Sequence, residues 1–159
     1  MPHTRVHSLS GEPDFKSLHI LIVDDDAPML DLIEALLQSI GVGHVTRADS
    51  GVDAFAKLSK TDRVVDCVLC DYTMANGNGL QLLQAIRMGQ IKYFRPDACF
   101  VLLTASSDPT TVAMAMELDV NGYLVKPVTS DKLRVAISKA RARSFRINFQ
   151  KYSQVVVPA

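Results

Sequence analysis

Polar side chains suited to phosphoryl chemistry stand directly after four apolar runs of the chain. These residues are Asp24 and Asp25, Asp71, Thr104 and Lys126. Clustered carboxylates repel one another and invite a hard divalent cation such as Mg²⁺, which prefers oxygen ligands. A carboxylate can act as a nucleophile, while an ammonium and a hydroxyl stabilise the charge on a transferring phosphoryl group. These residue types therefore predict transfer of a phosphoryl group to a carboxylate, with Asp71 as the acceptor.

The apolar runs are typical of strands in a parallel sheet. They lie at residues 19–23, 44–48, 64–70, 99–103 and 122–125. Helical spacing and capping residues predict helices at 28–40, 51–60, 80–88 and 109–118, and from 130 onwards. Strand and helix alternate five times, which predicts a doubly wound α/β fold with a parallel sheet and helices on both faces. The carboxyl ends of its strands would meet at one edge, where such folds bind ligands.

Composition sets broad limits on the class of protein. The chain has 159 residues, with 17 basic and 17 acidic side chains, and 48% of it is hydrophobic. This indicates one globular domain with tails, and no charge excess that would attract nucleic acid or a membrane. No apolar run approaches the roughly 18 residues of a membrane span, and the start lacks the apolar core of a signal peptide. We therefore expect a cytoplasmic protein with a polar N-terminal tail at residues 1–17.

Three cysteines, Cys67, Cys70 and Cys99, lie in or beside expected strands. Cys67 and Cys70 have the spacing of a redox motif. Residues three apart in a strand point to opposite faces, however, so these two thiols cannot act together. We interpret the cysteines as reduced and structural.

Four segments resemble the receiver domain of two-component response regulators, of the kind seen in the chemotaxis response regulator. They are LIVDD at 21–25, VLCDYTM at 68–74, LLTA at 102–105 and GYLVKP at 122–127. Their order and spacing make the resemblance specific. It covers residues 18–143, leaves a C-terminal extension at 144–159, and implies a flavodoxin-like (βα)₅ sheet with the strand order 2-1-3-4-5.

The resemblance also implies roles for the acidic residues. Asp71 would be the phosphoacceptor of a protein that catalyses its own phosphorylation and dephosphorylation, rather than an enzyme with a separate substrate. Asp25 would bind Mg²⁺ or Mn²⁺ directly, and Asp24 would act through water. Asp71 and the backbone carbonyl of Thr73 would complete the protein's share of the metal ligands.

Further roles follow for residues of the fourth and fifth strands. Lys126 would contact the phosphoryl oxygens, and Pro127 would follow a cis peptide bond. Thr104 would be the switch hydroxyl that moves toward the phosphoryl group. Tyr123 would be the aromatic residue that swings inward behind it; the alternative is a half-exposed tyrosine of an ordinary strand.

Two positions depart from the simplest form of the pattern. The family usually has proline after the methionine, whereas this chain has Ala75 in a turn rich in glycine and asparagine. A more flexible loop is expected there. Asp26 extends the acidic pair to three, and we interpret it as a cap of the first helix.

The resemblance implies a histidine kinase or phosphotransfer protein as phosphodonor, and a protein target downstream. The 16 residues after Arg143 are too few for a DNA-binding domain, so we expect a stand-alone receiver. The tail at 145–159 is compatible with folding back on its own domain, with a homodimer or partner contact, and with disorder. Tyr93 and Phe94 are expected to be buried against the sheet.

Two rival functions remain open from the residues. A haloacid-dehalogenase-type phosphatase would use Asp24, Asp26, Thr104 and Lys126, but it would leave Asp71 unexplained. A pseudo-receiver would bind partners without phosphorylation. The intact acidic, hydroxyl and lysine set argues against the second rival.

Overall fold

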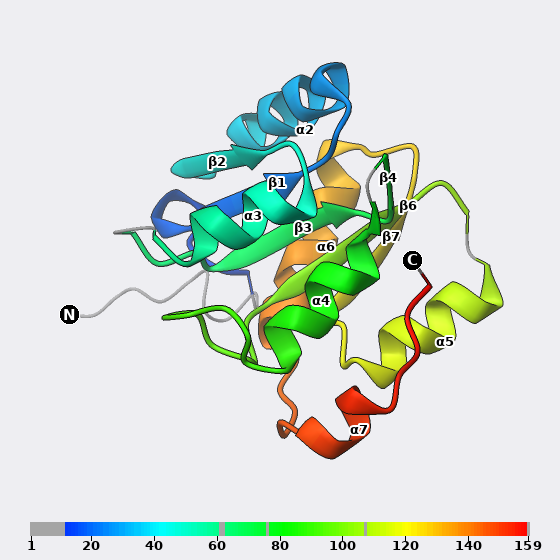
Figure 1. Ribbon diagram of the computed structural model, residues 1–159. Coiled ribbons are helices and arrows are strands. Elements are labelled where there is room, and N and C mark those ends of the chain that lie inside the picture. Colours follow the sequence, from blue (N-terminus) through cyan, green and yellow to red (C-terminus); the bar gives the residue numbers. More distant parts are fainter. Residues whose placement is uncertain (1–11, 61–62, 76, 107, 159) are drawn as a thin grey trace.

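A five-stranded parallel sheet forms the centre of the computed structural model, which describes residues 12–60, 63–75, 77–106 and 108–158 (Figure 1). Its strands are β1 (His19–Val23), β2 (His44–Ala48), β3 (Cys67–Asp71), β6 (Phe100–Thr104) and β7 (Gly122–Val125). Their order is β2-β1-β3-β6-β7, so the predicted doubly wound sheet with the order 2-1-3-4-5 is confirmed. The short strands β4 (Thr73–Met74) and β5 (Gly77–Asn78) pair as a separate antiparallel hairpin after β3.

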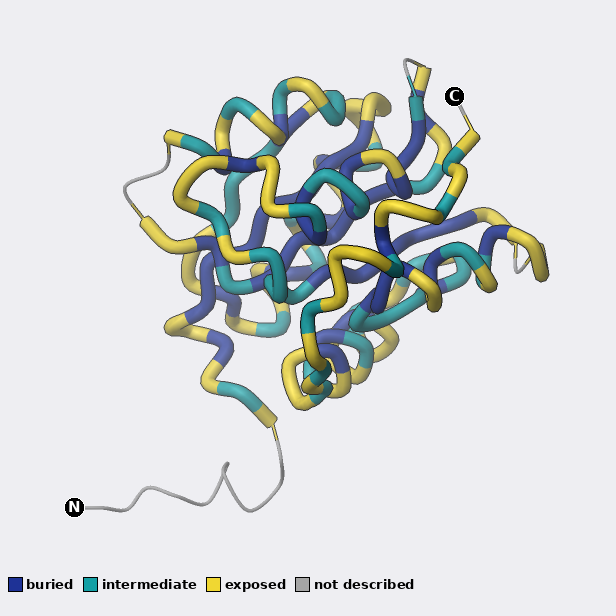
Figure 2. The backbone as a smooth tube through the Cα atoms, turned by 60° about the horizontal axis from the view of Figure 1, so that its bottom comes forward, coloured by how far each residue is buried: buried dark blue, intermediate teal, exposed yellow. Residues whose placement is uncertain are grey.

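Helices cover both faces of this sheet (Figure 1). One face packs against α2 (Ala27–Ile40) and α6 (Ser130–Ala142). The other packs against α3 (Gly51–Leu58), α4 (Gly79–Arg87) and α5 (Pro109–Glu117). Side chains alternate between the two cores along each strand, as the twofold period of a strand requires. The inner strands therefore run through the middle of the molecule as buried backbone (Figure 2).

Side-chain caps fix where four of the five helices that cover the sheet begin. Ser50, Asn78, Asp108 and Thr129 each accept a hydrogen bond from the backbone N–H three residues further on. Asn78 and Gln81 form a complete capping box at the start of α4. Because α4 begins directly after the β4–β5 hairpin, this cap also anchors the loop that follows Asp71.

The third strand begins later than its apolar residues predict. Val64 was expected inside the strand but is 77% exposed, and β3 starts at Cys67. Asp66 explains the difference, because its carboxylate accepts a hydrogen bond from the His19 N–H at 2.8 Å and its own N–H donates to the His19 carbonyl. Tyr93 was also wrongly expected to be buried. It is 85% exposed in a turn with φ +67°.

The two ends of the described chain pack against the domain. Residues 1–11 of the predicted N-terminal tail lie outside the described residues, while Phe15–Ser17 forms a short 3-10 helix, η1, with Phe15 in the core. The C-terminal tail folds back on its own domain. It forms α7 (Phe149–Ser153), and its backbone accepts hydrogen bonds from Gln84 and Asn78 of the α4 region (Figure 1). Among the described residues, none of the helices combines the length and the hydrophobicity that a membrane span requires.

Arg87 joins the end of α4 to the loops around it. Its side chain is fully buried, and all five of its N–H donors are used. The acceptors are the carbonyls of Leu118, Asp119, Pro96 and Ala98 and the side-chain oxygen of Asn121. Burial lowers the pKa of the guanidinium to about 10, so it stays charged at neutral pH. Asp119 in turn accepts from the buried Tyr152 hydroxyl at 2.6 Å, which ties the tail to this cluster.

Replacing Arg87 by leucine should lower the free energy of unfolding by about 3–5 kcal/mol, because five oxygens in and around the core each lose a hydrogen bond from the guanidinium. Urea denaturation of the wild type and the variant measures this difference. Arg95→Leu is the matched control, since the Arg95 side chain is 81% exposed and forms an exposed ion pair with Asp97. Its effect should stay below about 1 kcal/mol. Equal losses from the two variants would contradict the role given to Arg87.

Candidate functional site

The strand register brings the predicted site residues together at one edge of the sheet. Val23 pairs with Cys70, so Asp24 follows beside Asp71, the last residue of β3. Thr104 ends β6 and pairs with Val125, and Lys126 comes next. Parallel pairing alone therefore aligns the carboxyl ends of β1, β3, β6 and β7, as the sequence predicts for this fold.

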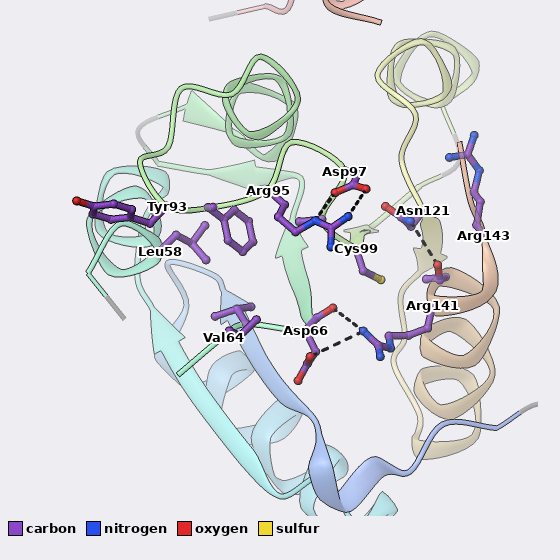
Figure 3. A pocket seen from close by; sticks show the side chains of 14 residues that line it. Leu58, Val64, Asp66, Tyr93, Arg95, Asp97, Cys99, Asn121, Arg141 and Arg143 are labelled. Carbon is purple, nitrogen blue, oxygen red and sulfur yellow. Dashed lines mark hydrogen bonds and ion pairs between the residues drawn. The ribbon is translucent and has the colours of Figure 1, made fainter. Parts of the chain in front are cut away.

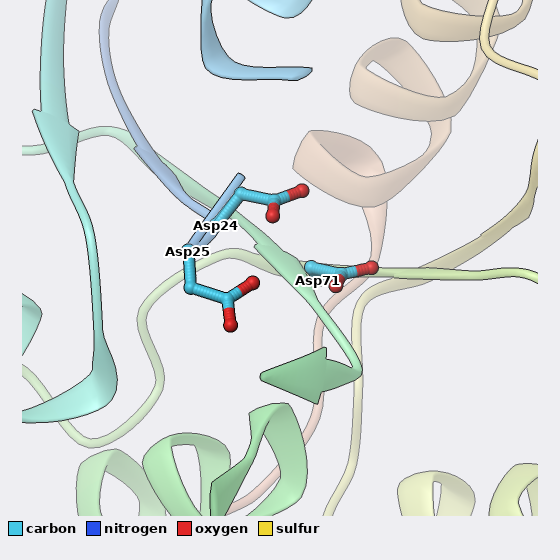
Figure 4. A group of neighbouring side chains, drawn as sticks. All are labelled: Asp24, Asp25 and Asp71. Carbon is cyan, nitrogen blue, oxygen red and sulfur yellow. The ribbon is translucent and has the colours of Figure 1, made fainter. Parts of the chain in front are cut away.

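Three carboxylates form the acidic part of this site. Asp24, Asp25 and Asp71 each offer an oxygen that lies within 4.8 Å of the other two, and Figure 4 shows the three side chains next to one another. Asp24 and Asp71 are buried, whereas Asp25 is exposed. Asp26 occupies the N-cap of α2 as expected, but its side chain makes no capping hydrogen bond. Its backbone N–H donates to Asp24 Oδ1 at 2.9 Å.

Burial and mutual repulsion make this acidic group costly to ionise. Burial raises the pKa of Asp24 to about 6, and the neighbouring charges of Asp71 and Asp25 act in the same direction. The hydrogen bond from Asp26 and the charge of Lys126 oppose them. Burial also raises the pKa of Asp71, against the effect of its hydrogen bond to Lys126. A bound cation would relieve both causes of this cost.

Lys126 supplies the positive charge of the site. Its Nζ lies 2.8 Å from Asp71 Oδ1 and 4.0 Å from Asp24 Oδ2. The Lys126 N–H donates to the Thr104 carbonyl at 2.8 Å, which fixes the backbone beside β6. The peptide bond between Lys126 and Pro127 is cis. The lysine, which follows the edge strand β7, thus reaches across β6 to the acidic group at the ends of β1 and β3.

One buried carboxylate oxygen indicates that the three carboxylates could bind a hard cation. Asp24 Oδ2 is the buried side-chain oxygen that has no hydrogen-bond partner within the described residues. Buried carboxylate oxygens rarely lack a partner, and such exceptions call for an explanation. Three carboxylates that converge on one space match the oxygen ligands of Mg²⁺ or Mn²⁺. Thr73, whose carbonyl is the further predicted ligand, lies in β4 two residues after Asp71.

The predicted switch residues share one acceptor. The Thr104 hydroxyl donates to the Ser106 carbonyl at 3.0 Å, and the Tyr123 hydroxyl donates to the same carbonyl at 2.9 Å. Burial raises the pKa of Tyr123. Both hydroxyls therefore hold the loop that leads from β6 to α5.

Sequence reasoning missed one contact of the site, which is made by a backbone group. The Ala75 N–H donates to Asp25 Oδ2 at 2.7 Å. Proline has no N–H and could not make this bond. The signal was present in the sequence, because Ala75 is the position where this chain departs from the pattern it resembles. The departure was interpreted only as added flexibility.

Comparisons with known proteins agree with this fold. The family model of the response regulator receiver domain matches residues 20–138. Chemotaxis protein CheY-3 of Vibrio cholerae is 33% identical over 124 residues, which cover 78% of this chain and 92% of that protein. Transcriptional regulatory protein ZraR of Klebsiella oxytoca is 35% identical over 136 residues, 86% of this chain. The matched part is only 28% of ZraR.

Solved structures of receiver domains also superpose on this chain. A response regulator receiver domain protein from Clostridium thermocellum superposes with a TM-score of 0.69 at 28% identity, covering 78% of this chain and 94% of its own. The chemotaxis protein CheY4 of Vibrio cholerae superposes with a TM-score of 0.67 at 25% identity, covering 77% and 98%. From the matched family model, the relatives and the sheet order, we conclude that this chain belongs to the response regulator receiver domain family of two-component signalling.

Proposed function

We propose that this chain accepts a phosphoryl group on Asp71 from a histidine kinase or a phosphotransfer protein, in a reaction that requires Mg²⁺ or Mn²⁺. The observation that carries the proposal is the contact of 2.8 Å between Lys126 Nζ and Asp71 Oδ1, beside the carboxylates of Asp24 and Asp25. An acceptor carboxylate, its positive partner and a metal-binding group are thereby within reach of one another.

The chemistry needs little beyond positioning. A carboxylate oxygen of Asp71 attacks the phosphorus of a phosphohistidine, so that an O–P bond forms while the P–N bond breaks. The freed imidazole nitrogen keeps the electron pair and takes up a proton. Lys126 stabilises the charge on the equatorial phosphoryl oxygens. Asp24, Asp25, Asp71 and the Thr73 carbonyl would hold the cation, which supplies further charge neutralisation when bound.

The response to phosphorylation would pass through the shared carbonyl of Ser106. New negative charge at Asp71 would attract the Thr104 hydroxyl, which now donates to Ser106. Tyr123 would then remain as the donor to that carbonyl, and the loop before α5 would rearrange. The proposed output is a changed protein-binding surface on α5, β7 and α6, read by a downstream protein target.

Asp71→Asn should abolish phosphorylation. Wild-type protein incubated with acetyl phosphate and Mg²⁺ should gain about 80 Da in intact mass, the mass of one phosphoryl group. The variant should gain nothing, and removal of Mg²⁺ by EDTA should prevent the gain in the wild type. Asp26→Asn is the matched control, because its side chain is exposed and lies outside the group of three carboxylates. A phosphoryl group on the Asp71→Asn protein would overturn the assignment.

Ala75→Pro should weaken Mg²⁺ binding by about tenfold, because partners that orient metal ligands typically contribute this much. The substitution removes the N–H that holds Asp25. Met74, the residue before it, lies in β4, and an extended residue is compatible with a following proline. Ala75→Ser keeps the N–H and should bind Mg²⁺ like the wild type. Isothermal titration of the three proteins decides, and unchanged affinity in Ala75→Pro would refute the positioning role.

Thr104→Ala should separate phosphorylation from its response. Beryllium fluoride, a phosphoryl mimic, should change amide hydrogen exchange across α5 in the wild type. The variant lacks the hydroxyl that moves, so its exchange in α5 should stay the same with and without the mimic. Thr110→Ala, at an exposed position of α5, controls for the loss of a threonine. An equal response in Thr104→Ala would contradict the switch.

A further inference from the structure

Two cysteines that the proposed phosphoryl transfer does not use lie in contact at the opposite end of the sheet. Cys67 begins β3 and Cys99 directly precedes β6. Their Sγ atoms are 3.3 Å apart. Cys70 points into the other core, as its spacing from Cys67 predicts. The CxxC spacing was therefore rightly set aside, and the partner of Cys67 comes from the neighbouring strand instead.

Backbone geometry places this pair in register. Val68 pairs with Phe100, and the Val68 N–H donates to the Cys99 carbonyl at 2.9 Å. Cys67 and Cys99 are thus lateral neighbours on adjacent parallel strands, which lie about 4.8 Å apart. That spacing falls within the roughly 4.4–6.8 Å between Cα atoms that a disulfide spans. A bond between the two sulfurs would therefore not require the strands to separate.

Cys99 is also reachable from solvent. It is partly exposed and lines a cleft of about 470 Å³, whereas Cys67 is completely buried behind it. Figure 3 shows the Cys99 side chain between Arg95 and Arg141, which lie on two walls of this cleft. Arg141 is held in place by the Asp66 carbonyl, to which it donates at 3.2 Å. A small molecule entering the cleft would meet Cys99 first.

The surroundings favour the reactive form of Cys99 over that of Cys67. The hydrogen bond with Cys67 lowers the pKa of Cys99, and the positive charges of Arg141 and Arg87 act in the same direction, against burial. The same contact raises the pKa of Cys67, as does burial. The thiolate is the nucleophile in cysteine oxidation. The two thiols thus differ in the way that an attacking and a resolving cysteine differ.

We propose that Cys99 and Cys67 form an oxidisable dithiol pair, in which a hydroperoxide entering the cleft oxidises Cys99 and Cys67 then closes a disulfide. In the first step the Cys99 thiolate attacks a peroxide oxygen. An S–O bond forms, the O–O bond breaks, and water or an alcohol leaves after protonation. In the second step Cys67 sulfur attacks the sulfenic sulfur of Cys99. An S–S bond forms, the S–O bond breaks, and the hydroxide leaves with the Cys67 proton as water.

The oxidised pair would connect β3 and β6, the two strands that carry Asp71 and Thr104 at their other ends. The bond would lie on the face covered by α2 and α6. It would add a covalent link where the strands are now joined only by hydrogen bonds. The proposed phosphoacceptor Asp71 and the proposed switch residue Thr104 would then lie at the ends of two strands that are covalently cross-linked.

Intact mass after treatment of the full chain with hydrogen peroxide tests the pair. The wild type should lose about 2 Da, the mass of two hydrogens, and should remain a single chain. After denaturation, N-ethylmaleimide should label Cys70 and neither of the other two thiols. Cys70→Ala should lose the same mass, because its thiol is fully buried in the other core. Cys99→Ser should keep its mass and all remaining thiols.

The order of the two steps has its own test. Cys67→Ser removes the resolving thiol, so dimedone should trap a sulfenic acid at Cys99 in this variant. No dimedone adduct should form at Cys67 in Cys99→Ser. Three free thiols in treated wild type, a disulfide between two chains, a sulfinic acid at Cys99 in place of the disulfide, or loss of Cys70 together with Cys67 would each overturn the proposal.

Discussion

Repulsion among three carboxylates is the constraint on which the site depends. Asp24, Asp25 and Asp71 place oxygens within 4.8 Å of one another, and two of these side chains are buried. Two unit charges 4 Å apart repel by about 1 kcal/mol in water and by about 4 kcal/mol near a protein surface. Lys126 offsets part of this cost through its contact with Asp71. The remainder favours a divalent cation at this group.

The sheet accounts for how a chain can hold this unfavourable group. Strands buried on both faces are positioned by their backbone pairing and by two hydrophobic cores, so the residues that follow them have little freedom. Apolar burial along β1, β3 and β6 offsets the charge repulsion at their ends. The relative positions of the acidic group, the lysine and the threonine are therefore set by how the strands pair, and not by flexible loops. The loop contacts from Ala75 to Asp25 and from Asp26 to Asp24 both use backbone donors.

The sequence was sufficient where backbone periodicity decides the outcome. The helices between the strands and the alignment of Asp71 with Lys126 follow from apolar runs and from the rule that parallel strand ends meet. The order of the strands in the sheet came instead from the resemblance to receiver domains. The sequence was not sufficient to predict where an element begins when a single polar contact determines that position. Asp66 delays the start of β3 through hydrogen bonds to His19, although Val64 and Val65 continue the apolar run.

Contacts between segments that are far apart in the sequence likewise could not be predicted from the spacing of apolar residues. The tail residues around Tyr152 are compatible with a helix or a strand, and their docking depends on Asp119 and Gln84 far away in the sequence. The contact of Cys67 with Cys99 depends on the register of β3 against β6. Short local patterns carry no information about such register. The same limit explains why the strand period could exclude the CxxC pair without pointing to Cys99 as the neighbour of Cys67.

The position of a bound cation tests the central claim most directly. Crystals grown with Mn²⁺ and beryllium fluoride would locate the metal by its anomalous signal. The account predicts one metal peak in the space between Asp24, Asp25 and Asp71, with the fluoride complex on Asp71 and in contact with Lys126. A metal bound elsewhere, or a fluoride complex absent from Asp71 while the metal is present, would contradict it.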